Sequence, residues 1–215
     1  MYSIPPILKD LLQLCEFIAL FFGVLKFNSL KNSYWKWFVF YLLYIFTYEI
    51  FCRVYLSTFE TEIRLFLSLI QIPFEFLFFF WLIGYQSLQR KTLFWCITAV
   101  YLLSFGIENY AFDEAKYSFK SLSQSFGTLL MLILVGLEFV KQIKSDDILS
   151  FTSNKMFYIN LGVILFYIGN MPFFGLYNLI LDHPEIWNGY YKYFMISNCS
   201  MYLLFAASFI WGKIK

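Results

Sequence analysis

Residues 63–83 read IRLFLSLIQIPFEFLFFFWLI, a nearly continuous apolar run that is long enough to cross a membrane as one helix. Four polar residues interrupt the run, at Arg64, Ser68, Gln71 and Glu75. They are four, three and four residues apart, so on a helix of about 3.6 residues per turn they share one face. This spacing predicts a membrane-spanning helix whose single polar face is turned away from lipid.

The most informative of these residues is Glu75, which falls near the midpoint of the span. A carboxylate is costly in hydrocarbon, so we expect Glu75 to face other helices, water or a ligand. Pro73 removes a backbone N–H donor close by, which predicts a bend in the helix at this point.

The composition of the whole chain is that of a membrane protein. Of its 215 residues, 60% are hydrophobic and 24% aromatic, whereas only 14% are charged. Soluble domains are typically about 25% charged, so this chain has too few polar residues to cover a globule in water. The net charge of +2 argues against nucleic acid as a partner. The four cysteines have no CxxC spacing, and we interpret Cys15, Cys52, Cys96 and Cys199 as small apolar residues.

Apolar runs of similar length recur along the chain. We predict an all-α fold, a single domain over residues 1–215 that forms an integral membrane bundle of seven helices. The predicted spans cover residues 7–27, 34–56, 62–84, 92–110, 119–140, 154–181 and 190–211. The first run contains Glu16 and no A-x-A site follows it, so we interpret it as a retained helix and not as a cleaved signal peptide.

The distribution of basic residues predicts the orientation. The loops after the first, third and fifth spans, their flanks and the C-terminus hold ten of the 16 lysines and arginines: Lys26, Lys31, Lys36, Arg90, Lys91, Lys141, Lys144, Lys155, Lys213 and Lys215. Because cytoplasmic loops are enriched in basic residues, this asymmetry predicts that the C-terminus is cytoplasmic and the N-terminus is outside. We expect a multi-pass protein of the inner (cytoplasmic) membrane.

Other polar residues suggest specific contacts within the bundle. Glu16 lies near mid-membrane in the first span, and Glu49 and Arg53 are four residues apart, a spacing that predicts an ion pair on one helix face. Asn170 and Pro172 predict a kink at which the Asn170 side chain donates to a freed backbone carbonyl. The sequence from Ser57 to Glu60 fits a capping box that opens the third span.

Several membrane enzymes are disfavoured by the residues that they require. A metal hydrolase needs several histidines or carboxylates around one ion, whereas His183 is the sole histidine and falls in a loop. A retinal protein needs a lysine inside the last span, but Lys192 and Lys213 flank that span. No serine–histidine pair is available within the membrane, and no phosphate- or dinucleotide-binding motif occurs. We therefore expect no enzymatic activity, no metal and no cofactor.

Two stretches carry a resemblance to known proteins. The segments FYIGNMPF (residues 166–173) and MYLLFAASFIWGK (residues 201–213) resemble a group of small seven-span inner-membrane proteins of Bacteroidota bacteria. The group implies the same fold over the whole chain and provides no activity to transfer. Its members are similar to the membrane sensor modules at the N-termini of some bacterial histidine kinases, an analogy of fold only.

Three functions remain open. The first is a membrane sensor or receptor-like protein that holds a ligand in a polar and aromatic cavity open to the outer side and acts through a separate signalling protein or a second copy of itself. The predicted ligand-binding wall consists of Glu49, Arg53, Arg64, Ser68, Gln71, Glu75, Asn170 and Asn198. The second is a small transporter or channel in which Glu16 and Glu75 carry protons or cations. The third is an assembly or scaffold subunit whose polar residues only join helices within the lipid.

Overall fold

The structure is a computed structural model that describes residues 6–55, 61–111, 121–144, 151–175, 180 and 183–213. The helices are α1 (Pro6–Leu25), α2 (Phe27–Leu30), α3 (Trp35–Tyr55), α4 (Thr61–Phe80), the π-helix η1 (Trp81–Ser87), α5 (Lys91–Ala111), α6 (Ser121–Lys144), α7 (Lys155–Gly175) and α9 (Pro184–Trp211). The predicted all-α class is confirmed.

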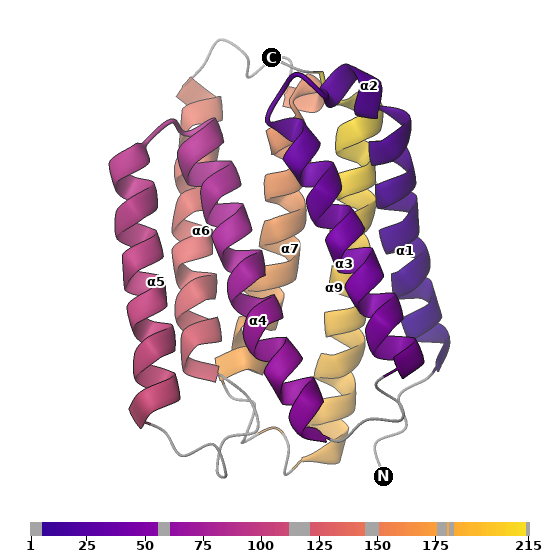
Figure 1. Ribbon diagram of the computed structural model, residues 1–215, viewed down its shortest axis with the longest axis vertical. Coiled ribbons are helices and arrows are strands. Elements are labelled where there is room, and N and C mark those ends of the chain that lie inside the picture. Colours follow the sequence, from indigo (N-terminus) through magenta and orange to yellow (C-terminus); the bar gives the residue numbers. More distant parts are fainter. Residues whose placement is uncertain are drawn as a thin grey trace.

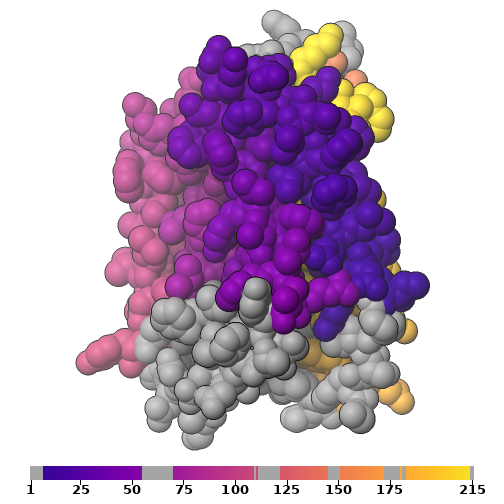
Figure 2. All heavy atoms as spheres, turned by 45° about the vertical axis from the view of Figure 1, so that its right-hand side comes forward, coloured from indigo at the N-terminus to yellow at the C-terminus, as the bar shows by residue number. Residues whose placement is uncertain are grey.

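The long helices run up and down beside one another (Figure 1). In one row, α5 packs against α6, α6 against α7, α7 against α9 and α9 against α1. The helices α4 and α3 cross in front of this row, and Figure 2 shows them covering that side of the bundle between α5 and α1. Because successive long helices alternate in direction, α1 begins at one end of the bundle and α9 finishes at the other.

Within the described ranges, four helical segments are long and apolar enough to cross a membrane, judged by length and composition: Trp35–Val54, Lys91–Glu108, Leu122–Lys144 and Pro184–Trp211. The outward faces of the helices are also apolar. On α5, for example, Trp95 is 63% exposed and Leu103 is 65% exposed. Large apolar faces of this kind suit lipid and not water, so the chain has the features of a multi-pass membrane protein.

Aromatic rings fill the centre of the bundle. The rings of Tyr41 on α3 and Phe78 on α4 stack with centroids 4.2 Å apart. Phe205 of α9 contacts Phe38 of α3 at 5.2 Å and Phe79 of α4 at 6.0 Å between centroids. These contacts between buried and half-buried rings, typically worth about 0.5–1.5 kcal/mol per pair beyond their buried area, help to hold α3 and α4 onto the row behind them.

Glycines allow two of the closest approaches. A Cβ atom built at Gly162 of α7 would lie 3.2 Å from the backbone oxygen of Met201 on α9, so the absence of a side chain lets these two helices pack tightly. A Cβ atom at Gly127 of α6 would lie 2.8 Å from the ring of Phe76, which is buried on α4. At both positions an added methyl group would force a neighbouring atom to move, further at Gly127 than at Gly162.

The helix α4 changes from α-helical to π-helical geometry at its C-terminal end. Pro73 lies inside α4, and the helix continues past it. After Phe80 the backbone becomes the π-helix η1, which ends with the N–H of Leu88 bonded to the oxygen of Ile83 at 2.8 Å. The widened turn was not expected from the sequence. Gln89 then adopts a left-handed conformation (φ 58°) and turns the chain into α5.

Candidate functional site

Two adjoining cavities lie near the end of the bundle where α1 and α9 begin and α3 finishes. The first, which we call the mouth cavity, has a volume of about 310 Å³ and is lined by residues of α1, α3 and α9. The second, the deep cavity, has a volume of about 200 Å³ and extends toward α4, α6 and α7. They share four lining residues, Glu16, Glu49, Phe194 and Asn198, so the two cavities form one site.

Three carboxylates from three helices line the deep cavity: Glu16 of α1, Glu49 of α3 and Glu75 of α4. Glu16 is 3% exposed, and its Oε2 atom has no hydrogen-bond partner among the described residues. Glu75 accepts a hydrogen bond of 2.9 Å at Oε1 from the Tyr167 hydroxyl of α7. This bond turns Glu75 toward α7 and fixes one side of the cavity.

Amide oxygens complete the polar lining. Oε1 of Gln71, Oε1 of Gln124 and Oδ1 of Asn198 are buried and have no hydrogen-bond partner within the described part of the chain. With Oε2 of Glu16, four acceptor atoms without a donor line the same cavity. Because buried polar atoms in native proteins are nearly always hydrogen-bonded, this concentration marks a place that receives hydrogen-bond donors.

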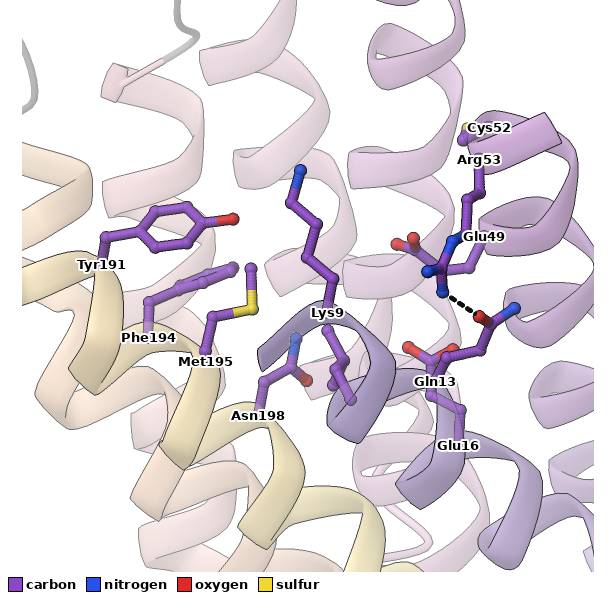
Figure 3. A pocket seen from close by; sticks show the side chains of 11 residues that line it. Lys9, Gln13, Glu16, Glu49, Cys52, Arg53, Tyr191, Phe194, Met195 and Asn198 are labelled. Carbon is purple, nitrogen blue, oxygen red and sulfur yellow. Dashed lines mark hydrogen bonds between the residues drawn. The ribbon is translucent and has the colours of Figure 1, made fainter. Parts of the chain in front are cut away.

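The mouth cavity carries the cationic residues. Figure 3 shows Tyr191, Phe194, Met195 and Asn198 of α9 on one side, with Lys9, Gln13 and Glu16 of α1 and Glu49 and Arg53 of α3 on the other. Arg53 donates a hydrogen bond of 2.5 Å to Oε1 of Gln13, drawn as a dashed line, and forms an ion pair with Asp10.

These contacts of Arg53 correct the ion pair expected from sequence. Glu49 and Arg53 are both described, and no ion pair joins them; Arg53 instead pairs with Asp10 of α1. The spacing of four residues allowed a pair within α3, but it could not show that a carboxylate and an amide of the neighbouring helix lie within reach of the guanidinium. Arg53 therefore ties α3 to α1, and the Glu49 carboxylate stays on the cavity wall.

Most of the predicted wall comes together in the structure. Glu49, Arg53, Gln71, Glu75 and Asn198 line the joined cavities, as does Glu16, which was assigned to the alternative ion pathway. Arg64 and Ser68 belong to α4, but their side chains lie outside the described residues, as does the capping box from Ser57 to Glu60.

Asn170 of the predicted wall lies apart from the two joined cavities. It is fully buried between α7 and α9, where its Nδ2 donates to Oγ of Ser197 at 3.0 Å and to the backbone oxygen of Phe166 at 2.6 Å. The predicted donation to a backbone carbonyl does occur, but a proline at position 172 frees the carbonyl four residues earlier, that of Ile168. Asn170 thus joins helices and does not line either cavity.

Other lining residues were absent from the predicted wall. Gln124 lies near the start of α6 between Ser123 and Ser125, where a polar first turn of a helix is common and gives little signal of a site. Nothing in the sequence singles out Tyr167 or Tyr202 from the 17 tyrosines of the chain. Among the described residues, no group of three or more histidine, cysteine or acidic side chains could hold a metal ion.

In comparisons with models of protein families, curated proteins and solved structures, none matches this chain. The resemblance to the Bacteroidota proteins therefore stays a prediction, and function has to be argued from the cavity itself.

Proposed function

We propose that this chain is a membrane sensor or receptor-like protein that binds a small ligand from the outer side of the cytoplasmic membrane and acts through a separate partner, without catalysis. The observation that carries the proposal is the deep cavity, where four buried oxygen atoms lack donors and aromatic side chains supply apolar walls. Pockets that combine apolar walls with a few convergent polar groups are typical ligand sites.

The topology in this proposal has seven spans with the N-terminus outside. In its support, α1, α3, α4 with η1, α5, α6, α7 and α9 run alternately up and down the bundle. The helix ends that carry Lys36, Lys91, Lys141, Lys144 and Lys155 gather at the end opposite the mouth cavity. The positive-inside rule assigns that end to the cytoplasm, which leaves the mouth cavity open to the outside.

Among the described residues, packed aromatic rings beyond the deep cavity favour binding over transport. Beyond the deep cavity, the buried rings of Phe38, Phe79 and Phe205 pack against one another across the bundle. A separate cavity of about 320 Å³, lined by Glu138 and Lys155, lies on the far side of these rings. A ligand that enters from the mouth therefore reaches a closed end, as a sensor requires.

Transport is the second candidate, because Glu16 and Glu75 both line the deep cavity and a further cavity lies at the opposite end of the bundle. Such a protein would have to open the aromatic layer in each cycle. Purified chain in proteoliposomes is the test: gradient-driven flux of H⁺, Na⁺ or K⁺ that is lost in Glu75→Gln would favour this second function over sensing.

Labelling of Cys52 tests the proposed outer cavity. Cys52 lines the mouth cavity and is half-buried, Cys15 and Cys199 are buried, and Cys96 is exposed on α5. In a Cys96→Ala variant, a membrane-impermeant maleimide added to intact cells should label Cys52, and the Cys52→Ala, Cys96→Ala control should stay unlabelled. Labelling that appears only after the cells are opened would place the cavity on the cytoplasmic side and overturn the proposal.

A further inference from the structure

The deep cavity has a one-sided charge distribution. Within the described part of the chain, each charged side chain that lines it is a carboxylate, from Glu16, Glu49 and Glu75. Like charges gathered in a site of low polarity destabilise one another, and a bound cation relieves that repulsion. An anionic ligand would add to the repulsion instead.

The basic residues of the site lie toward the mouth. Arg53 lines the mouth cavity only, and its guanidinium already contacts Asp10 and Gln13. Lys9 also lines the mouth cavity and does not line the deep one. Among the residues that the structure describes, no basic side chain lines the deep cavity to neutralise its carboxylates.

The atoms without partners also favour a ligand that donates hydrogen bonds. The four buried atoms that lack a donor, on Glu16, Gln71, Gln124 and Asn198, are all acceptor oxygens. An ammonium group carries up to three N–H donors and no acceptor, so it matches this lining in both charge and hydrogen bonding. Glu16, at 3% exposed, would otherwise hold a buried carboxylate oxygen without any donor.

The aromatic lining of the deep cavity favours an organic ammonium ion over a metal ion as the ligand. Phe76, Phe166 and Phe194 line the same cavity and provide apolar surface that a hydrated metal ion does not use. Aromatic faces also attract cations, at about 0.5–2 kcal/mol per contact. The deep cavity has a volume of about 200 Å³, whereas one water molecule occupies about 30 Å³ in the liquid. The cavity therefore has room for a small organic ion.

We propose that the deep cavity binds a small organic ammonium ion, with the ammonium group between Glu16 and Glu75 and the apolar part against Phe76, Phe166 and Phe194. The inference rests on the proposed ligand-binding function and assigns the chemical class of the ligand.

Three ring compounds of similar size but different charge provide the test: benzylammonium, benzyl alcohol and benzoate. Binding to the purified full-length chain is measured by titration calorimetry at constant ionic strength. We expect benzylammonium to bind at least tenfold more tightly than benzyl alcohol, and benzoate to show no binding. Glu16→Gln and Glu75→Gln should each weaken benzylammonium binding at least tenfold, whereas Glu185→Gln, an exposed carboxylate at the start of α9, should not.

The outcomes separate this inference from the proposed function. Equal affinity for benzylammonium and benzyl alcohol, or a preference for benzoate, overturns the ammonium ligand but leaves a ligand cavity in place. No binding of any of the three compounds also overturns the ammonium ligand, and the outer cavity is then judged by Cys52 labelling, which needs no ligand. Charge selectivity is measured on the unsubstituted chain, so it does not depend on whether either glutamine variant folds.

Discussion

The hydroxyl of Tyr167 on α7 donates a hydrogen bond of 2.9 Å to Oε1 of Glu75 on α4. The two side chains also lie beside a shared aromatic cluster, since the ring of Phe76 is 5.4 Å from that of Tyr167 between centroids. The bond joins the polar face of α4 to the row of helices behind it. Glu75 itself lines the deep cavity.

Removing this donor should cost stability. In Tyr167→Phe, Glu75 keeps its place but loses a hydrogen bond in a mostly buried setting, and leaving such an acceptor unpaired typically costs about 1–3 kcal/mol. We expect a lower melting temperature in detergent, measured by a thermal unfolding assay. A second substitution, Glu75→Gln, should cost less in the Tyr167→Phe background than alone, because the bond is already lost. Equal costs in both backgrounds would show that the two residues are uncoupled.

The packing of α4 against α6 can be tested with two glycine substitutions on α6, of which one serves as the control. Gly127→Ala places a methyl group 2.8 Å from the buried ring of Phe76, which also packs on Tyr101 at 5.1 Å and so has little room to move. Overpacking of this kind costs about 1–3 kcal/mol. Gly136→Ala on the same helix meets no atom within 4 Å and improves helix propensity by up to about 1 kcal/mol.

Thermal unfolding should therefore rank the Gly136→Ala variant at or above the unsubstituted chain and the Gly127→Ala variant below it. The comparison is clean because both changes add the same methyl group to α6. If the two variants have the same melting temperature, α4 and α6 are not packed as the structure has them.

The sequence predicted those features that depend on periodicity within one helix. The spacing of Gln71 and Glu75 placed them on one face of α4, and both line the deep cavity. Periodicity does not show which helix stands opposite, so it could not show that Asn170 contacts Ser197 of α9 and lies apart from the two cavities. The same limit concealed the Tyr167 donor and the Asp10 partner of Arg53, since both contacts join residues far apart in the chain.

The π-helix η1 lay beyond prediction for another reason. Its residues Trp81–Ser87 read WLIGYQS, in which Gly84 is the sole residue that weakens an α-helix. The wide turn lies where the end of α4 meets α5 and α6, and Gly84 packs there near Phe94 and Leu134. Such a choice between helix types is made by tertiary packing and not by local propensity.

Substitution of two asparagines, Asn170 and Asn198, should distinguish a residue that stabilises the fold from one that binds the ligand. Asn170→Ala removes the side-chain bonds to Ser197 and Phe166 but leaves the cavity lining unchanged, so we expect a lower melting temperature and unchanged affinity for benzylammonium. Interhelical hydrogen bonds in membranes average about 0.6 kcal/mol, so the loss should be modest. Asn198→Ala removes an unpartnered oxygen from both cavities and should weaken binding at little cost in stability. Calorimetry and thermal unfolding on the same samples give both quantities.

Topology can be tested independently of any ligand. A reporter that is active only in the cytoplasm should be active when fused after Lys215. A reporter that is active only outside the cytoplasm should be active when inserted near Glu114. The reason is the cluster of lysines at the end of the bundle opposite the mouth cavity. A C-terminal fusion that is active on the outer side would reverse the orientation and open the mouth cavity to the cytoplasm.

Arg53 forms an ion pair with Asp10 of α1 and not with Glu49 of its own helix, and two double-mutant cycles can test this pairing. The structure pairs it with Asp10, and the side chains of Arg53 and Asp10 are 49% and 57% exposed. An exposed pair contributes about 0.2–1 kcal/mol, and salt weakens it further. A double-mutant cycle of Asp10→Asn with Arg53→Gln should therefore give a small coupling free energy at low ionic strength that shrinks as salt is added.

The matched cycle replaces Asp10→Asn with Glu49→Gln. Glu49 sits one turn from Arg53 on α3 but forms no ion pair with it, so these two losses of stability should add. Thermal unfolding measures both cycles on the same protein preparation. Coupling of Arg53 to Glu49 in place of Asp10 would restore the pair expected from spacing alone. It would also place a cation beside the deep cavity and so weaken the case for an ammonium ligand.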